Sequence, residues 1–144
     1  MIIDEVKELW SKDAAINVDD LANEAAKICQ LHSKYYNIFI DARRQLKKLE
    51  SKHKLIRRLK REYYLGQLSP EQIKKLEWEP FDLKLLKQEV ETYLDSDEHL
   101  IGSFLQISDQ QILCDFLESI IRTINNRGFH IKNSVDFIRW TNGV

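Results

Sequence analysis

The residue types best suited to chemistry in this sequence are the cations gathered between positions 43 and 64. This basic segment holds ten lysines and arginines against two glutamates, whereas the other 122 positions hold 12 basic and 21 acidic residues. At 100° per residue of an α-helix, several of the cations project within an arc of about 60°, with Arg57 just beside them: Arg43, Lys47, Lys54, Arg58 and Arg61. A linear row of cations suits the phosphates of a linear polyanion, and phosphate contacts need no base-reading groups.

The alternative interpretation of the basic segment is an ordinary solvated helix face. Solvated faces usually mix charge signs, because opposite charges four residues apart stabilise a helix. Here Arg43 and Lys47 are like-charged at that spacing, and so are Lys54 and Arg58, each pair costing about a few tenths of a kcal/mol. A bound anion would relieve this repulsion, so the pattern favours binding of nucleic acid or another polyanion.

Two tyrosines, Tyr63 and Tyr64, close the basic segment. Aromatic rings beside basic grooves stack on unpaired bases in proteins that bind single strands. Tyr63 continues an apolar pattern described below, which favours a packing role. Tyr64 lies nearer the row of cations and is the candidate for base stacking, with packing as its alternative.

Other candidate sites are weaker. Cys29 and His32 lie one helical turn apart, but no second pair has the spacing of a metal site. Acidic residues at 89, 91, 95, 97 and 98 form either a solvated turn or a docking surface for a basic partner. The sequence lacks the phosphate-binding loop, the nucleophile elbow and the calcium-loop motif. We therefore expect no metal, no cofactor and no enzymatic activity.

Length and composition indicate a single all-α domain. The chain has 144 residues, 43% hydrophobic and 31% charged, with only four glycines and two prolines, which suits long helices with few breaks. No apolar run approaches the roughly 20 residues that span a bilayer. The first ten residues lack the layout of a signal peptide, and two cysteines are too few for a disulfide framework. We expect an intracellular protein.

A heptad pattern dominates the first half of the chain. It follows a short helix over residues 3–12 and a break at 13–18, and predicts one helix over about residues 19–65, about 70 Å long. A chain of this size cannot bury such a helix along its whole length, so part of the pattern should pack against other subunits. We call these positions the seam: Leu21, Ala25, Ile28, His32, Tyr35, Phe39, Ala42, Leu46, Leu49, His53, Ile56, Lys60 and Tyr63.

The rest of the sequence predicts shorter helices. Gly66 ends the long helix, and Ser69, Pro70 and Gln72 form a capping box that starts the next one. Pro80 interrupts that helix, and another ends near residue 93. Residues 95–103 are typical of a loop. A second capping box at residues 108–111 opens an apolar helix, residues 125–128 end it, and residues 131–140 form a last short helix.

Four groups of residues recur in a known order: Glu24–Ala26, Ser33–Tyr35, Arg58–Gly66 and Asn126–Lys132. Their order and spacing resemble those of the UvsY recombination mediator proteins of T-even-like bacteriophages. The resemblance is ungapped from residue 1 to about 66 and returns from about 107 to 139, whereas residues 67–106 match poorly.

The resemblance implies a non-enzymatic recombination mediator in the cytoplasm of the infected bacterial host. Such mediators bind single-stranded DNA and contact both the phage single-strand-binding protein and the recombinase UvsX. They help the recombinase nucleate its filament in recombination, repair and recombination-dependent replication. They work as ring-like homo-oligomers, so a hexamer or heptamer is expected. Arg58 and Lys60 match the DNA-contacting positions of the family.

The resemblance also implies that different segments of one mediator domain, residues 1–144, have different roles. Residues 1–66 would bind DNA, 67–106 would form a variable helical connection, and 107–144 would assemble the oligomer. The expected DNA-binding residues are Arg43, Lys47, Lys54, Arg57, Arg58, Lys60, Arg61 and Tyr64. The expected assembly residues are Phe116, Ile120, Ile124, Phe129, Ile131, Val135 and Ile138.

Lys60 poses a geometric difficulty, because helical spacing places it on the seam, away from Arg58. Either the seam ends before Lys60 or the DNA passes a surface built from more than one subunit, and we favour the second explanation. A competing hypothesis is a coiled-coil interaction protein whose basic helix binds an acidic protein or a membrane surface. A membrane-surface helix needs a broad, bulky apolar face, whereas this seam includes Ala, His and Lys, so the membrane is the poorer alternative.

Overall fold

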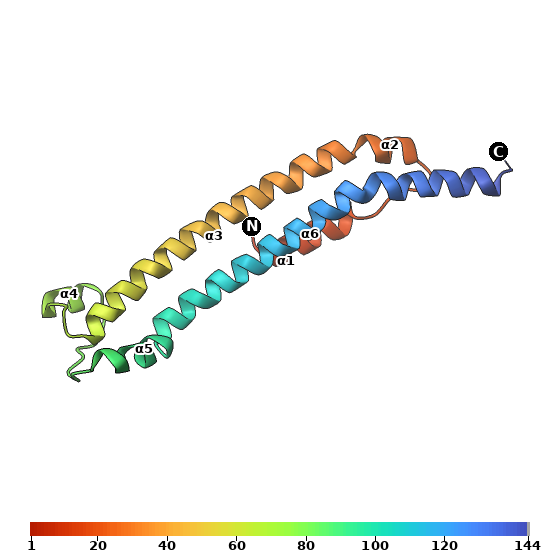
Figure 1. Cartoon of the computed structure of the whole chain (residues 1–144). Helices are drawn as coiled ribbons and strands as arrows, with labels where there is room; N and C mark the ends of the chain where they lie inside the picture. Colours follow the sequence, from red (N-terminus) through yellow and green to blue (C-terminus); the bar gives the residue numbers. More distant parts are fainter. Residues whose placement is uncertain (144) are drawn as a thin grey trace. The chain divides into compact units, whose positions relative to one another are not determined.

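The computed structural model describes residues 1–143, and every regular element in that range is an α-helix, which confirms the all-α class (Figure 1). The chain divides into two compact units. Unit 1 comprises Met1–Gln45 and Gln110–Val144, and unit 2 comprises Leu46–Asp109. The two longest helices contribute one part to each unit. The helices are α1 (Ile3–Asp13), α2 (Leu21–Ala26), α3 (Ile28–Tyr64), α4 (Pro70–Lys75), α5 (Lys87–Asp95) and α6 (Glu98–Thr141).

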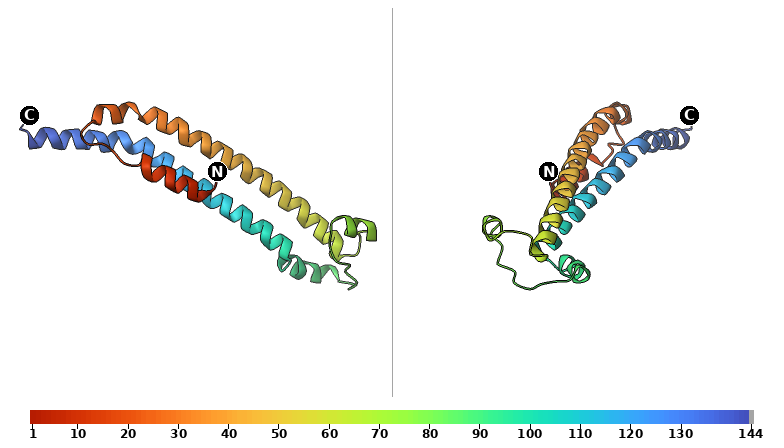
Figure 2. Two further views of the ribbon diagram at one scale, coloured as in Figure 1. Left: turned by 180° about the vertical axis from the view of Figure 1, so that it is seen from behind. Right: turned by 60° about the vertical axis from the view of Figure 1, so that its left-hand side comes forward.

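Unit 1 is built from α1, α2, the first part of α3 and the second part of α6, which runs antiparallel to α3 (Figures 1 and 2). Tyr35 on α3 is fully buried and meets Trp10 of α1 edge to face, with ring centroids 5.3 Å apart. Gln110 on α6 donates a hydrogen bond to the Ala42 carbonyl of α3 at 2.9 Å. The face of α6 toward this core repeats every three or four residues, at Leu113, Leu117, Ile120, Ile124, Arg127 and Ile131.

A buried arginine ties the loop between α1 and α2 to α6 in unit 1. Arg127 is 4% exposed, and its guanidinium donates to the backbone carbonyls of Asp13 and Ala15 at 3.1 and 3.0 Å. It also pairs with the buried Glu24 carboxylate of α2 at 3.1 Å. Asp13 ends α1 and Ala15 lies in the loop that follows, so Arg127 supplies donors to carbonyls at the end of the helix and in the loop. We call this arrangement the Arg127 clamp.

Unit 2 packs the second part of α3 against α5 and the start of α6. Val90, Leu94 and Leu100 form its apolar core, and His53 of α3 lies 3.0 Å from the Ser103 hydroxyl of α6. The capping box at Ser69 is confirmed, because its hydroxyl accepts from the Gln72 N–H and the Gln72 side chain accepts from the Ser69 N–H. The predicted end of the long helix at Gly66 is also confirmed.

A glycine takes the left-handed conformation at the end of α3, whereas a glutamate takes it at the end of α4. Gly66 has φ +71°, in the left-handed region that glycine adopts without steric cost. At the end of α4 the same role falls to Glu77, with φ +60°. Two backbone bonds close that turn, from Glu77 N–H to Lys74 and from Trp78 N–H to Ile73, which is the Schellman arrangement. The helix therefore ends before Pro80 rather than at it.

The helix predicted over about residues 19–65 is interrupted once. Lys27 separates α2 from α3, although its backbone keeps right-handed helical angles (φ −78°, ψ −13°). Most seam positions are buried or half-buried, and Ala25 is an exception. The premise that one chain cannot cover such a helix is wrong, because α6 is a second long helix that contacts α3 within each unit. That part of the seam also contacts other subunits stays a prediction. The most fully buried seam residues are Tyr35, Ala42, Leu46, Lys60 and Tyr63.

The predicted division of the last third of the chain into a loop and two helices is wrong. Residues 98–141 form one helix, so residues 108–111 do not start a helix and residues 125–128 do not end one. A cap is worth about 1 kcal/mol, and a glycine inside a helix costs about as much. Burying each of Ile120, Ile124 and Ile131 contributes about 1.5–3 kcal/mol, so packing outweighs the local signals.

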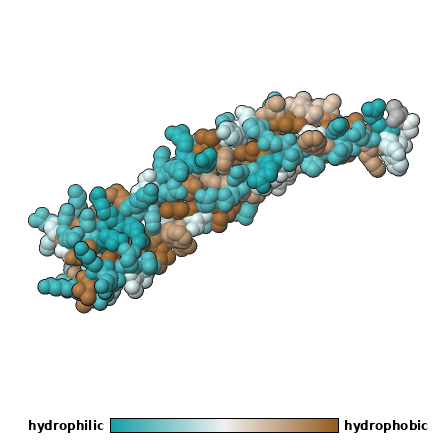
Figure 3. Space-filling model, viewed as in Figure 1, coloured by the Kyte–Doolittle hydropathy of each residue, from teal (hydrophilic) through white to brown (hydrophobic). Residues whose placement is uncertain are grey.

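Large apolar side chains remain on the surface of α6. The face drawn in Figure 3 carries hydrophobic residues among predominantly hydrophilic ones. Phe129, Phe137 and Trp140 are 70%, 65% and 78% exposed. Within the described residues, no helix combines the length and apolar character needed to cross a membrane.

Candidate nucleic-acid interface

The basic segment occupies the second half of α3, and most of its cations face solvent. In unit 2, Lys47, Lys54 and Arg58 are exposed, and in unit 1 Arg43 is exposed. Arg58 and Lys47 reach only local carboxylates: Arg58 lies 3.8 Å from Glu62, and Lys47 lies 3.4 Å from the glutamate three residues on. Pairs this exposed contribute little to stability and are readily exchanged for another anion. These cations are therefore available to phosphates.

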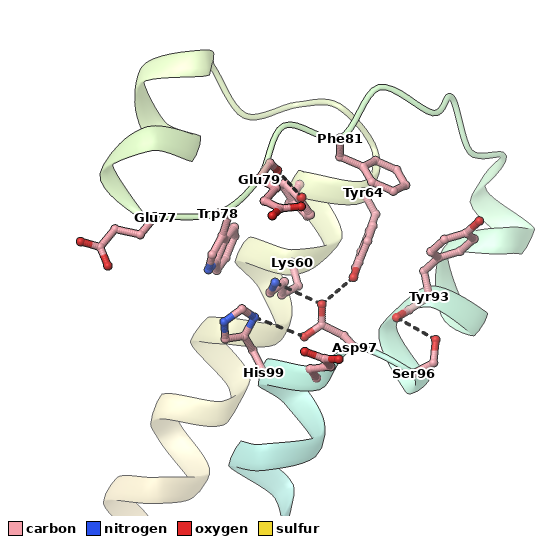
Figure 4. A pocket seen from close by; sticks show the side chains of 12 residues that line it. Lys60, Tyr64, Glu77, Trp78, Glu79, Phe81, Tyr93, Ser96, Asp97 and His99 are labelled. Carbon is pink, nitrogen blue, oxygen red and sulfur yellow. Dashed lines mark hydrogen bonds and ion pairs between the residues drawn. The ribbon is translucent and has the colours of Figure 1, made fainter.

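Lys60 does not belong to this exposed group. Its side chain is 4% exposed, and its ammonium lies 3.1 Å from the Asp97 carboxylate. The ammonium also lies 4.1 Å from the ring centroid of Trp78 and 5.2 Å from that of Tyr63. The seam therefore continues through Lys60, and the explanation that the seam ends before it is wrong, because the side chain is enclosed by its own chain (Figure 4). A DNA path over more than one subunit stays a prediction.

Tyr64 is engaged in the same cluster. Its hydroxyl donates to the Asp97 carboxylate at 2.5 Å, and its ring meets Phe81 edge to face at 5.0 Å. Tyr63 is buried, as its seam position predicts, and its hydroxyl donates to the Glu79 carbonyl. In this conformation the Tyr64 ring has protein partners where a stacked base would lie, so a stacking role remains an untested prediction.

The electrostatics of the Asp97 cluster follow from its contacts. Burial alone would raise the pKa of the Asp97 carboxyl, but hydrogen bonds from Tyr64, the Leu100 N–H and Lys60 outweigh burial and hold this pKa below its ordinary value. Burial and the hydrogen bond to Asp97 both raise the pKa of the Tyr64 hydroxyl. Asp97 is therefore ionised at neutral pH and Tyr64 is not, which keeps Lys60 paired.

A cavity of about 550 Å³ opens beside this cluster (Figure 4). Its walls combine aromatic rings with the carboxylates of Glu77, Glu79, Asp97 and Glu98, against the single ammonium of Lys60. Like charges repel at these separations, so the cavity is a poor site for phosphate. The cation-rich surface of α3 and this cavity are chemically distinct.

Arg57 and Arg61 are half-exposed and share one partner. The Glu91 carboxylate of α5 accepts from Arg57 at 2.8 Å and from Arg61 at 2.5 Å. A hydrogen bond from Arg61 is the largest cause that lowers the pKa of Glu91 below its ordinary value. The sequence placed Glu91 in an acidic patch but gave no signal of this pairing, because about 30 residues separate the partners along the chain.

The expected assembly residues fall into two groups. Ile120, Ile124 and Ile131 are buried within the chain, and Phe116 is partly buried. The others are exposed and remain candidates for contact with another copy: Phe129, Val135 and Ile138.

The two residues considered for a metal have other environments. His32 stacks on Tyr36 with ring centroids 5.5 Å apart, and Cys29 is exposed. Within residues 1–143, no three His, Cys, Asp or Glu side chains gather as a metal site would require.

A family model and a curated relative point to the same protein family. The family model described as "Recombination, repair and ssDNA binding protein UvsY" matches residues 9–144. The recombination protein uvsY of Enterobacteria phage T4 is 26% identical over 136 residues, which is 94% of each chain.

Solved structures of the bacteriophage T4 recombination mediator protein UvsY have the same fold. One crystal form superposes with a TM-score of 0.84 at 24% identity, covering 97% of this chain and 99% of that one. Another gives a TM-score of 0.81 at 25% identity, covering 95% and 98%.

Proposed function

The chain belongs to the UvsY family of recombination, repair and single-stranded DNA-binding proteins, and on that premise we propose that it is a recombination mediator. It binds single-stranded DNA and helps a UvsX-type recombinase replace the phage single-strand-binding protein on that DNA. It does so without catalysis, in the cytoplasm of the infected host. The observation that carries this proposal is the exposed cationic surface of α3 in a chain of near-neutral net charge, −1.

The DNA contacts are assigned by accessibility. Lys47, Lys54 and Arg58 of unit 2 are exposed and form the main phosphate contacts, and Arg43 in unit 1 adds to them. Phosphate contacts of this kind bind all sequences alike. Lys60 supports the interface instead of touching DNA, because it holds Asp97 and the surrounding rings in place.

The mediator acts as a homo-oligomer, with six or seven subunits expected. Phe129, Phe137 and Trp140 expose large apolar rings on the last turns of α6, and a second copy of the chain would cover them. Oligomerisation multiplies weak contacts, since each further subunit binds the same strand at a high effective concentration. A row of a few cations per chain then suffices for tight binding.

Recombinase loading tests the proposal. Filament assembly by the cognate UvsX-type recombinase is followed on single-stranded DNA already covered by the cognate single-strand-binding protein. Adding this protein should shorten the lag before assembly, and the effect on naked DNA should be smaller. An unchanged lag on covered DNA would contradict the mediator role and favour a basic helix that binds an acidic protein.

A further inference from the structure

The contact between α5 and the basic helix has the chemistry of an occupied anion site. The two oxygens of the Glu91 carboxylate bridge the guanidinium groups of Arg57 and Arg61, at 2.8 and 2.5 Å. The two arginines lie four residues apart, on neighbouring turns of one face of α3. A phosphodiester also presents two charged oxygens, and guanidinium donors bind carboxylate and phosphate with the same planar geometry.

We propose that Arg57 and Arg61 form a phosphate-binding site for single-stranded DNA in which the Glu91 carboxylate is an internal competitor. This inference rests on the proposed function and adds its regulation: the strand must displace Glu91 before it gains these two contacts. Glu91 thereby lowers the affinity of the site for any single free anion, and a strand held by neighbouring cations overcomes the competition through its many phosphates.

The exposure of the three side chains makes this displacement feasible. Arg57, Arg61 and Glu91 are 38%, 43% and 49% exposed, so water can solvate each charge once the pair separates. Ion pairs at such exposed sites are weak and easily screened.

Displacement also leaves α5 in place. The helix is anchored by the buried Val90 and Leu94, and the carboxylate that caps its first turn, by accepting from the Leu86 N–H, is that of Glu89 and not Glu91. Rotation of the Glu91 side chain toward solvent therefore breaks no packing and no cap. Lys60, buried on α3, differs because it cannot leave Asp97 without opening the core.

Substitution of Glu91 tests the competition. Fluorescence anisotropy with a labelled single-stranded oligonucleotide, at a series of salt concentrations, measures the affinity of the full chain and of Glu91→Gln. The amide is isosteric and uncharged, so the variant should bind about two- to tenfold more tightly at low salt. The gain should shrink as salt rises, because screening weakens the internal pair in the unmodified protein.

Glu89→Gln is the matched control. It removes the same charge from the same helix, and its amide oxygen can still accept the Leu86 N–H that the glutamate caps at 3.2 Å. Its affinity should stay within about twofold of the unmodified protein, since Glu89 contacts neither arginine and distant charges are screened. An equal gain in both variants would mean that only net charge matters and would overturn the proposal.

A second comparison shows whether Glu91 acts through the two arginines. In a chain that carries Arg57→Ala and Arg61→Ala, Glu91→Gln should leave affinity unchanged. A gain that persists there, or no gain in the intact background, contradicts the proposal. Glu91→Ala repeats the test if the amide variant folds poorly by circular dichroism. Salt-insensitive or absent binding by the unmodified protein would instead reject the DNA-binding function itself.

Discussion

Two sides of α3 in unit 2 carry cations with opposite environments. Arg58 is exposed and lies 3.8 Å from a carboxylate on its own helix, whereas Lys60, two residues later, is 4% exposed and bonded to Asp97 from another part of the chain. Helical spacing separates the two side chains by about 200°. A charge count over the basic segment cannot distinguish Arg58 from Lys60. Their surroundings do, because one cation faces solvent and the other is buried against a carboxylate.

Unit 1 shows the same contrast. Arg43 is exposed on α3, whereas Arg127 on α6 is buried in the Arg127 clamp. Charges left in water contribute little to stability, whereas removal of one member of a buried pair leaves its partner uncompensated. The exposed cations should therefore control DNA binding, and the buried cations should control folding.

Lys60→Ala should have the largest effect on stability. It leaves the Asp97 carboxylate buried without its cation, so the free energy of unfolding should fall by about 3 kcal/mol. Denaturant titration measures this loss, and Arg58→Ala, which removes an exposed cation of the same helix, should change stability by less than about 0.5 kcal/mol. Equal losses in the two variants would break the distinction between the two sides of α3.

The contribution of the buried Asp97–Lys60 pair to the free energy of unfolding should depend on pH. The folded-state pKa of Asp97 lies below the ordinary value, so its contribution is complete above that value, about pH 4, and is lost as pH falls through the folded-state pKa. The unmodified protein should exceed Asp97→Asn in free energy of unfolding by a constant amount between about pH 5 and 7. The difference should shrink below about pH 4, and a difference that grows in acid would contradict this sign.

The first long helix was accessible from the sequence because two kinds of signal agree there. The seam repeats over more than ten turns, and Gly66 supplies the left-handed residue that ends the helix. The second long helix was missed because local signals conflict with packing. Ser108 and Gln111 match a capping box and Gly128 suggests a stop. Nevertheless, half-buried positions continue the spacing of three or four residues past the first place, and buried positions continue it past the second.

The candidate site was predictable only in part. The helical spacing of the cations identified the exposed ones, and the seam placed Lys60 on the other side of α3. The partners of Lys60, Arg57 and Arg61 come from residues 91 and 97, within the segment that resembles the family poorly. No local pattern links residues about 30 positions apart, so the Glu91 contact and the Asp97 cluster required the fold.

The salt dependence of DNA binding tests the central claim most directly. Lys54→Ala combined with Arg58→Ala removes two exposed cations, and each phosphate contact to a single strand contributes about 0.7 to the slope of log affinity against log salt concentration. The account predicts a slope shallower by about 1.4 per engaged subunit, equally for mixed-sequence and homopolymer strands, with unchanged thermal stability and sedimentation. An unchanged slope in a folded double variant with the same oligomeric mass would contradict it.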